Sequence, residues 1–272
     1  KEEPGAWGGI HICGRAHTNA EGGKGSSEIG GAVYGGNDDA DNSGTLQYIR
    51  LEYTGFAFDE EHEANGISFY GVGNGTIVDH CQAYKGSDDG FEFFGGSVNV
   101  SNLVAVSCSD DSFDWTEGWN GKGTNLVAYQ EAESTLGYDC DCLMECDNNG
   151  SNNAATPVAH PVLKNLILVG NGGSKQGIRL RAGTEVEIDN AKVCGKGQPL
   201  TVETALTENA LKNGTSKLTN ITLTSELSSK EGIYTHADFI AVTSNKVDAN
   251  LSYSSFEDIR KECSWMNGSW VK

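Results

Sequence analysis

Short runs of alternating apolar and polar residues recur along most of the chain, and turns rich in Gly, Asn and Asp separate them. The clearest repeat joins residues 86–96 to residues 108–118, because the Asp pair at 88–89 returns at 110–111, an offset of 22 residues. A separate valine-rich run, residues 98–106, lies between the two blocks. Short strands that return at about this interval and are split by turns are typical of a solenoid coil.

The repeated blocks can be aligned into the register of one sheet. Alternate residues of a strand face the same way, and neighbouring strands lie about 4.8 Å apart, so equivalent residues form columns. One outward-facing column would hold Ser68, Glu92, Asp114, Glu145 and Arg179, and the column two residues later Tyr70, Phe94, Thr116, Asp147 and Arg181. An inward-facing column would hold Phe91, Phe113, Met144 and Ile178.

The fold class that fits this pattern is all-β: a right-handed parallel β-helix (solenoid) with a C-terminal cap containing short helices. Its narrow interior needs few apolar residues, which agrees with a hydrophobic fraction of 37%, and its turns use many of the 36 Gly. We expect coils over residues 1–198, with the repeat fading after Cys194, and a last coil and cap over residues 199–272 of the same domain. Within the cap, residues 201–213 and 256–263 predict short helices.

The charge of the chain restricts its partners. A formal net charge of −19 and a pI of about 4.6 argue against nucleic acid and anionic membrane surfaces. No apolar run is long enough to span a membrane. The excess carboxylate, which includes an acidic loop at residues 56–63, is compatible with calcium, with glycans or with solubility alone. The start at Lys1, in the middle of the pattern, suggests a processed or trimmed secreted product.

The cysteine count is even, which favours disulfides in an oxidising compartment. No CxxC pair is matched by a second one, which argues against a zinc ribbon. The crowding of three cysteines between residues 140 and 146 leaves a soft-metal site as the alternative. The disulfide candidates are Cys13, Cys81, Cys108, Cys140, Cys142, Cys146, Cys194 and Cys263, of which Cys81 and Cys108 could join neighbouring coils.

The motifs at residues 35–53, 65–66, 91–96 and 110–114, in this order, resemble a group of poorly characterised exported proteins of Gram-negative bacteria, especially Bacteroidetes and marine proteobacteria. Those proteins are lipoproteins or carry C-terminal sorting signals, and they look like right-handed parallel β-helices. The resemblance, from about Gly5 to Val193, implies a secreted, extracellular or outer-cell-surface location and supplies no catalytic residues. This chain departs from the group in its extra cysteines and its C-terminal region, which leaves the role of the tail open.

Two acidic clusters are candidate calcium sites. The spacing of Asp39, Asp41 and Ser43 matches the start of a calcium loop, although the distal Glu of an EF-hand is missing. The two Asp pairs, Asp88, Asp89, Asp110 and Asp111, would converge at one corner of adjacent coils, where a cation would relieve their repulsion. The alternative is that these side chains cap their own turns.

The outward column suggests two classes of function. As an enzyme, the protein would be a polysaccharide lyase or glycoside hydrolase with Glu92, Asp114, Glu145 and Arg179 as catalytic residues. As a binding protein, it would contact glycans through Trp115, Trp119 and Arg181, and exposed Tyr70 and Phe94 would add stacking surfaces. Because stacked charges are also ordinary solenoid surface, the sequence favours an adhesive or structural role, with glycan contact or self-association into an oligomer or filament.

Overall fold

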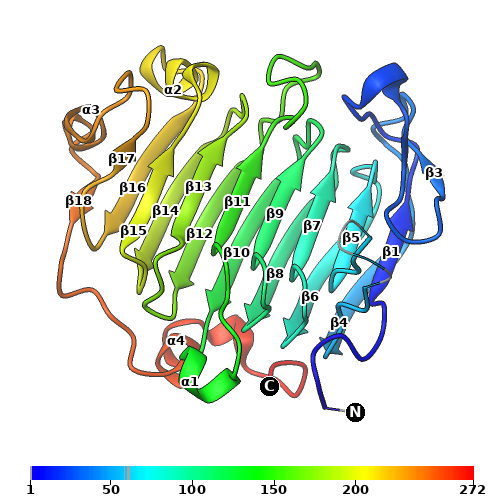
Figure 1. Ribbon diagram of the computed structural model, residues 1–272, viewed down its shortest axis with the longest axis horizontal. Coiled ribbons are helices and arrows are strands. Elements are labelled where there is room, and N and C mark those ends of the chain that lie inside the picture. Colours follow the sequence, from blue (N-terminus) through cyan, green and yellow to red (C-terminus); the bar gives the residue numbers. More distant parts are fainter. Residues whose placement is uncertain (1, 58, 60–61) are drawn as a thin grey trace.

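The computed structural model describes residues 2–57, 59 and 62–272, and most of this chain winds between two parallel sheets of eight strands each (Figure 1). The first sheet contains β1 (Ile10–Cys13), β5 (Ile67–Tyr70), β7 (Phe91–Phe94), β9 (Phe113–Thr116), β11 (Met144–Asp147), β13 (Gln176–Arg181), β15 (Gln198–Val202) and β17 (Ser228–Ser229). The second sheet contains β4 (Thr45–Glu52), β6 (Ile77–Tyr84), β8 (Asn99–Val106), β10 (Lys122–Tyr129), β12 (Val162–Val169), β14 (Glu187–Cys194), β16 (Lys217–Leu223) and β18 (Lys246–Val247). The chain alternates between the sheets, one strand of each per coil, which is the topology of the expected parallel β-helix.

Few other elements are present in the described chain. A small antiparallel hairpin pairs β2 (Gly25–Ser26) with β3 (Val33–Tyr34) beside the first coils. The helices are α1 (Glu133–Leu136), α2 (Ala205–Lys212), α3 (His236–Ala241), α4 (Phe256–Glu262) and the 3₁₀ turns η1 (Glu21–Gly23) and η2 (Ser264–Met266). None of the described helices has the length and apolar character that crossing a membrane requires.

The predicted register of the first sheet is confirmed. Glu92 pairs with Ser68 on one side and with Asp114 on the other, and Glu145 continues the column from Asp114 to Arg179. Because the pleat alternates, the inward residues between these positions form stacked columns of their own. Phe91 and Phe113, for example, lie with ring centroids 5.5 Å apart and are no more than 1% exposed.

The second sheet contains a feature that the sequence analysis missed. Near the middle of each long strand one residue adopts a positive φ, so every strand bends at the same level. In five successive strands, from β8 to β16, this residue is an asparagine. The side chains of the first four, Asn102, Asn125, Asn165 and Asn190, hydrogen-bond in a ladder. Asparagine tolerates the left-handed conformation better than other residues with a Cβ, which explains its selection. The signal was present as Asn in the fourth position of each valine- or leucine-rich run.

The C-terminal segment, from Leu251 onward, runs back along the second sheet. Ile259, Met266 and Trp270 bury their side chains against outward-facing residues of β8, β10 and β12. At its end the backbone N–H of Lys272 donates to the Gln82 side chain (2.8 Å), although 190 residues separate the two. The segment therefore ties the last coils to the first ones (Figure 1).

Two expectations need correction. The repeat does not fade after Cys194, because β15 and β16 complete another coil and β17 and β18 begin the next. The expected disulfides are absent: all eight cysteines are free thiols. Cys81 and Cys146 instead fill interior columns, where a thiol packs as a small apolar side chain. The acidic loop at 56–63 falls partly outside the described residues, since 58, 60 and 61 are among those not described.

Candidate functional site

The acidic residues of the repeated blocks lie in the turns that precede β7 and β9. Asp89 Oδ1 accepts the backbone N–H of Asp111 (2.8 Å), and Asp111 Oδ1 accepts the backbone N–H of Cys142 (2.6 Å). Each of these carboxyl groups therefore fastens its turn to the next coil, whereas the turn-capping alternative expected a bond to a backbone amide of its own turn. Only one oxygen of each carboxyl group is used in this way, so these inter-coil bonds are compatible with cation binding.

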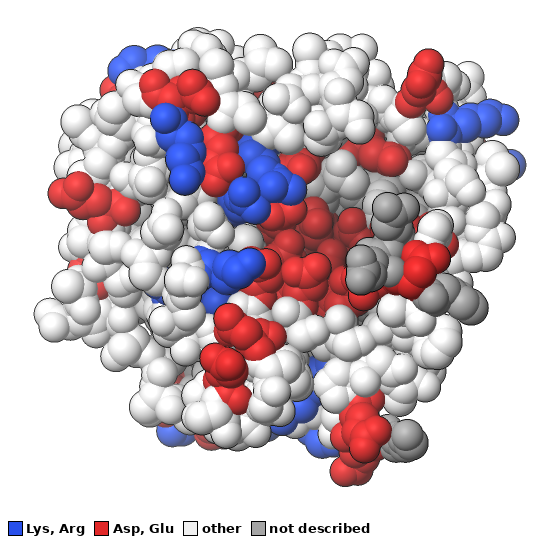
Figure 2. Space-filling model, in the orientation of Figure 1, with Lys and Arg blue, Asp and Glu red and all other residues white. Residues whose placement is uncertain are grey.

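Seven carboxyl groups line one cleft on the outer face of the first sheet. Figure 2 shows acidic side chains gathered in a hollow, with basic side chains along one side of it. The cleft has a volume of about 260 Å³ and is lined by Glu28, Glu63, Asp88, Asp89, Glu92, Asp110 and Asp114. Its walls are carboxylate throughout, so we call it the carboxylate cleft.

Two overlapping triads occupy the carboxylate cleft. Oxygens of Asp88, Asp89 and Asp110 lie within 4.8 Å of one another, and so do oxygens of Asp89, Glu92 and Asp114. Asp89 belongs to both triads. No Lys or Arg of the described chain forms an ion pair with any of these five residues, although the more distant Lys175 and Arg181 act to lower the pKa values of Asp110 and Asp114.

Burial and mutual repulsion raise the pKa values in the cleft. Burial, followed by the nearby carboxylates of Glu63 and Asp110, raises the pKa of Asp88 to about 8. Burial is also the main reason why the pKa values of Asp89, Glu92 and Asp114 lie well above their usual range, and neighbouring carboxylates add to it. Near neutral pH the cleft therefore retains protons that exposed carboxylates would have lost.

The next coils neutralise the same column with arginine. The Arg179 guanidinium donates to Glu145 (2.9 Å) and to Glu203 (3.2 Å), and Arg181 donates to Glu145 (2.5 Å) and Asp147 (2.8 Å). Arg179 and Arg181 are thus already held by carboxylates. Glu145 also approaches Asp111 and Cys142 in a third group of possible metal ligands, but its two arginine partners disfavour a cation there.

The other candidate calcium loop is engaged with the protein itself. Asp39 Oδ1 accepts from the backbone N–H of His17 (3.0 Å) and contacts its imidazole (2.7 Å). Asp41 Oδ2 accepts from the Ser43 hydroxyl (2.7 Å). Asp39 and Asp41 are not among the groups of converging His, Cys, Asp and Glu side chains in the described chain.

The predicted aromatic contact surface is wrong. Trp115 and Trp119 are at most 1% exposed, because Trp115 lies two residues after Phe113 and therefore shares its inward face. Phe93 stacks on Trp119 at 4.1 Å inside the solenoid. Tyr70 and Phe94 do face outward, but Tyr34 of the β2–β3 hairpin covers them. Of the three predicted ligand-binding residues, only Arg181 lies at the surface beside the cleft.

Sequence reasoning also missed two residues of the cleft. Glu28 comes from the β2–β3 hairpin and Glu63 from the loop before β5, and neither belongs to the repeated blocks. Burial raises the pKa of Glu28 to about 7, while the hydroxyl of Tyr70 (3.2 Å) opposes the shift. Because both residues lie in irregular segments, no periodic signal points to them.

Comparisons with known proteins agree with this architecture. A model of the pectate-lyase-like β-helix domain matches residues 1–271. Neither a search of curated proteins nor a search of solved structures found a match. The match covers almost the whole chain, and the two stacked parallel sheets are those of such a domain. The chain therefore belongs to the pectate-lyase-like β-helix family.

Proposed function

We propose that this protein binds and cleaves an acidic polysaccharide at the carboxylate cleft, as a polysaccharide lyase acting on uronate units. The observation that carries the proposal is the pair of triads that share Asp89 in a cleft without basic ion-pair partners among the described residues. Converging, buried carboxylates with raised pKa values are more typical of a functional site than of a solvated solenoid surface. Because acidic polysaccharides lie outside the cell, we also propose that the protein is exported.

The triad of Asp88, Asp89 and Asp110 would hold a divalent cation. Calcium prefers several oxygen ligands, and this triad offers oxygens alone. Beside the cleft, Asn65 is 1% exposed and donates to Glu92 (2.5 Å), while its Oδ1 has no hydrogen-bond partner in the described chain. A bound cation would neutralise the uronate carboxylate and make the neighbouring C5–H more acidic.

Glu92 and Asp114 would supply the acid and the base. They face the cleft from the adjacent strands β7 and β9, and their raised pKa values allow one to be ionised while the other keeps its proton. In an elimination, the ionised carboxylate takes the proton from C5, the C5–H electron pair forms the C4–C5 double bond, and the C4–O bond breaks. The protonated carboxyl then gives its proton to the departing oxygen, which balances the step.

The test is digestion of polygalacturonate and alginate by the full chain, with calcium or with chelator. We expect calcium-dependent loss of viscosity together with the ultraviolet absorbance of an unsaturated uronate. Glu92→Gln should abolish cleavage while polymer retention in affinity electrophoresis persists, and Asp88→Asn should raise the calcium concentration that is needed. The matched control is Glu226→Gln, an exposed carboxylate outside the cleft, which should behave as the unmodified protein. Neither cleavage nor retention of either polymer would contradict the proposal.

A second candidate is an adhesive or structural protein that binds glycans without cleaving them. It is favoured by the arginine pairs, because Arg179 and Arg181 are held by Glu145, Asp147 and Glu203 and are not available as bases. Calcium-dependent retention of the polymers without any unsaturated product would select this candidate. Self-association would show in the same samples as a mass above 28.9 kDa in light scattering.

A further inference from the structure

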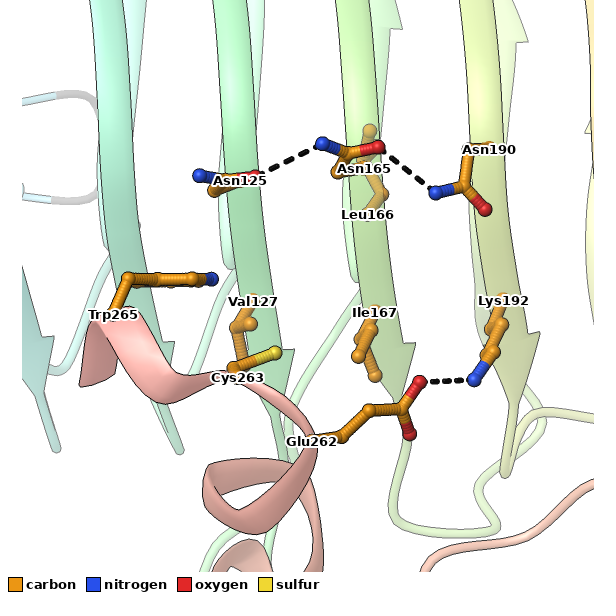
Figure 3. A pocket seen from close by; sticks show the side chains of 10 residues that line it. All are labelled: Asn125, Val127, Asn165, Leu166, Ile167, Asn190, Lys192, Glu262, Cys263 and Trp265. Atoms are coloured by element: carbon orange, nitrogen blue, oxygen red, sulfur yellow. Dashed lines mark hydrogen bonds and ion pairs between the residues drawn. The ribbon is translucent and has the colours of Figure 1, made fainter. Parts of the chain in front are cut away.

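A second pocket lies on the other sheet, between its outer face and the C-terminal segment. It has a volume of about 290 Å³, and Figure 3 shows it between strands β10, β12 and β14 on one side and the residues that end α4 and begin η2 on the other. Its lining is unlike that of the carboxylate cleft, since it combines carboxamide, aliphatic and aromatic side chains. We call it the tail pocket.

One edge of the tail pocket is the asparagine ladder. Asn165 donates to Asn125 (3.1 Å), and Asn190 donates to Asn165 (2.8 Å). A primary carboxamide has two N–H donors and an oxygen with two lone pairs, so the ladder uses only part of each side chain. The remaining donors and acceptors stand in a row along the pocket (Figure 3). Such a row suits a ligand whose polar groups both donate and accept, as hydroxyl groups do.

The opposite edge is aromatic and the floor is aliphatic. Figure 3 shows the Trp265 ring from its edge, with one face turned toward the asparagine row. Val127 and Ile167 form the floor and are 1% and 8% exposed. Aromatic and aliphatic surfaces of this kind pack against the C–H groups of a sugar ring, while its hydroxyl groups reach polar partners at the rim.

The charges of the tail pocket cancel. Lys192 and Glu262 are its charged lining residues, and they form an ion pair with each other. A charged ligand would find no uncompensated partner there and would lose its hydration. The tail pocket therefore favours a neutral ligand, in contrast to the carboxylate cleft, whose lining is acidic.

We propose that the tail pocket binds one unit of a neutral saccharide, as a second carbohydrate site on the second sheet. Its volume lies near the lower limit of the roughly 300–1,000 Å³ typical of small-molecule pockets, which suits a single sugar ring. The proposal does not depend on the function of the carboxylate cleft, since the two sites share no lining residue. A neutral-sugar site would let the protein hold a polysaccharide that carries both uronate and neutral units.

The test is a titration of the full chain with cellotriose, xylotriose, mannotriose and galactotriose in the presence of chelator. Binding is followed by calorimetry and by tryptophan fluorescence, which Trp265 should report. We expect at least one neutral trisaccharide to bind with a dissociation constant on the order of 1 mM, as a small and mostly preformed polar pocket allows. Trp265→Ala should weaken this binding about tenfold through the lost stacking surface.

A variant that fills the tail pocket separates loss of the binding site from loss of folding. Ile167→Phe places a ring on the floor of the tail pocket and should abolish binding. Val162→Phe on the same strand, where Val162 is 39% exposed and lies outside the pocket, should leave binding unchanged. The thermal unfolding of each variant confirms that it is folded. The proposal is overturned if none of the four trisaccharides binds, or if the Ile167→Phe variant binds as tightly as the unmodified protein.

Discussion

Removing divalent cations should make the stability of this protein fall as the pH rises. Asp88 is 8% exposed, and burial beside Glu63 and Asp110 raises its pKa from the ordinary 3.8 to about 8. Between these values the folded protein keeps a proton that the unfolded chain has lost. Because the folded state binds more protons, its stability is complete below the unfolded pKa and is lost as the pH rises through the folded pKa.

The size of the effect follows from linkage. One proton difference changes the free energy of unfolding by about 1.4 kcal/mol per pH unit, so Asp88 alone should remove up to about 3 kcal/mol between about pH 5 and about pH 7. For a chain of this size that corresponds to a fall of about 5 °C in melting temperature. Asp89, Glu92 and Asp114 act in the same direction. Carboxylates with lowered pKa values, such as Glu208, give their full stability above their unfolded pKa and do not offset the fall in this range.

The assay is thermal unfolding by circular dichroism in chelator across this pH range, repeated with calcium. If a cation binds at the triads, calcium should restore most of the lost stability, and more of it at the higher pH. Asp88→Asn should reduce the slope by about 1.4 kcal/mol per pH unit, whereas Glu226→Gln should not change it. A melting temperature that stays constant or rises with pH in chelator would refute the reasoning, because it would mean that the cleft does not retain protons.

Three further predictions concern the stability of the β-helix that carries the two sites. Asn165→Ala should destabilise the protein by about 3 kcal/mol in denaturant unfolding, because it removes two ladder hydrogen bonds and leaves an alanine at φ 60°. Asn165→Gly should cost about 1 kcal/mol less, because glycine adopts this positive φ without strain. Glu208→Gln should cost about 2 kcal/mol in the same assay, because the buried carboxylate accepts the backbone N–H groups of Glu231, Ile233 and Tyr234. Lys272→Ala should cost less than about 1 kcal/mol, because its ion pair with Glu52 is partly exposed to solvent.

The sequence predicted the part of the fold that repeats. The Asp-Asp blocks fixed the register from Ser68 to Arg179, because a one-residue slip would have turned the phenylalanines outward. The same rule would have buried Trp115, two residues after Phe113, and the expectation of an exposed Trp115 failed because it ignored that register. The convergence of Asp88, Asp89 and Asp110 also followed from the repeat, but Asp111, expected in the same cluster, is grouped with Cys142 and Glu145 instead.

What the sequence did not reveal depends on irregular segments. Glu28 reaches the carboxylate cleft from a hairpin, and Trp265 reaches the tail pocket from a segment that returns along the second sheet. Neither segment repeats at a regular interval, so residue spacing does not predict where Glu28 and Trp265 lie. The even cysteine count was misleading because Cys81 and Cys146 occupy interior columns, where their size and low polarity are sufficient reasons for their presence.

The stacking of coils gives the first sheet a charge gradient along its axis. Successive residues of the column read Ser68, Glu92, Asp114, Glu145, Arg179 and Thr201, so an acidic stretch without basic ion-pair partners gives way to one that arginine neutralises. The strands of this sheet are stacked at a regular spacing, so a substitution in the column changes the charge of one coil at a fixed position along the solenoid axis. A polyanion lying along this face would need cations at the acidic end and none at the arginine end. This asymmetry would fix the direction in which a uronate polymer lies across the carboxylate cleft. Only one part of the polymer would contact Asp88, Asp89 and Asp110 together.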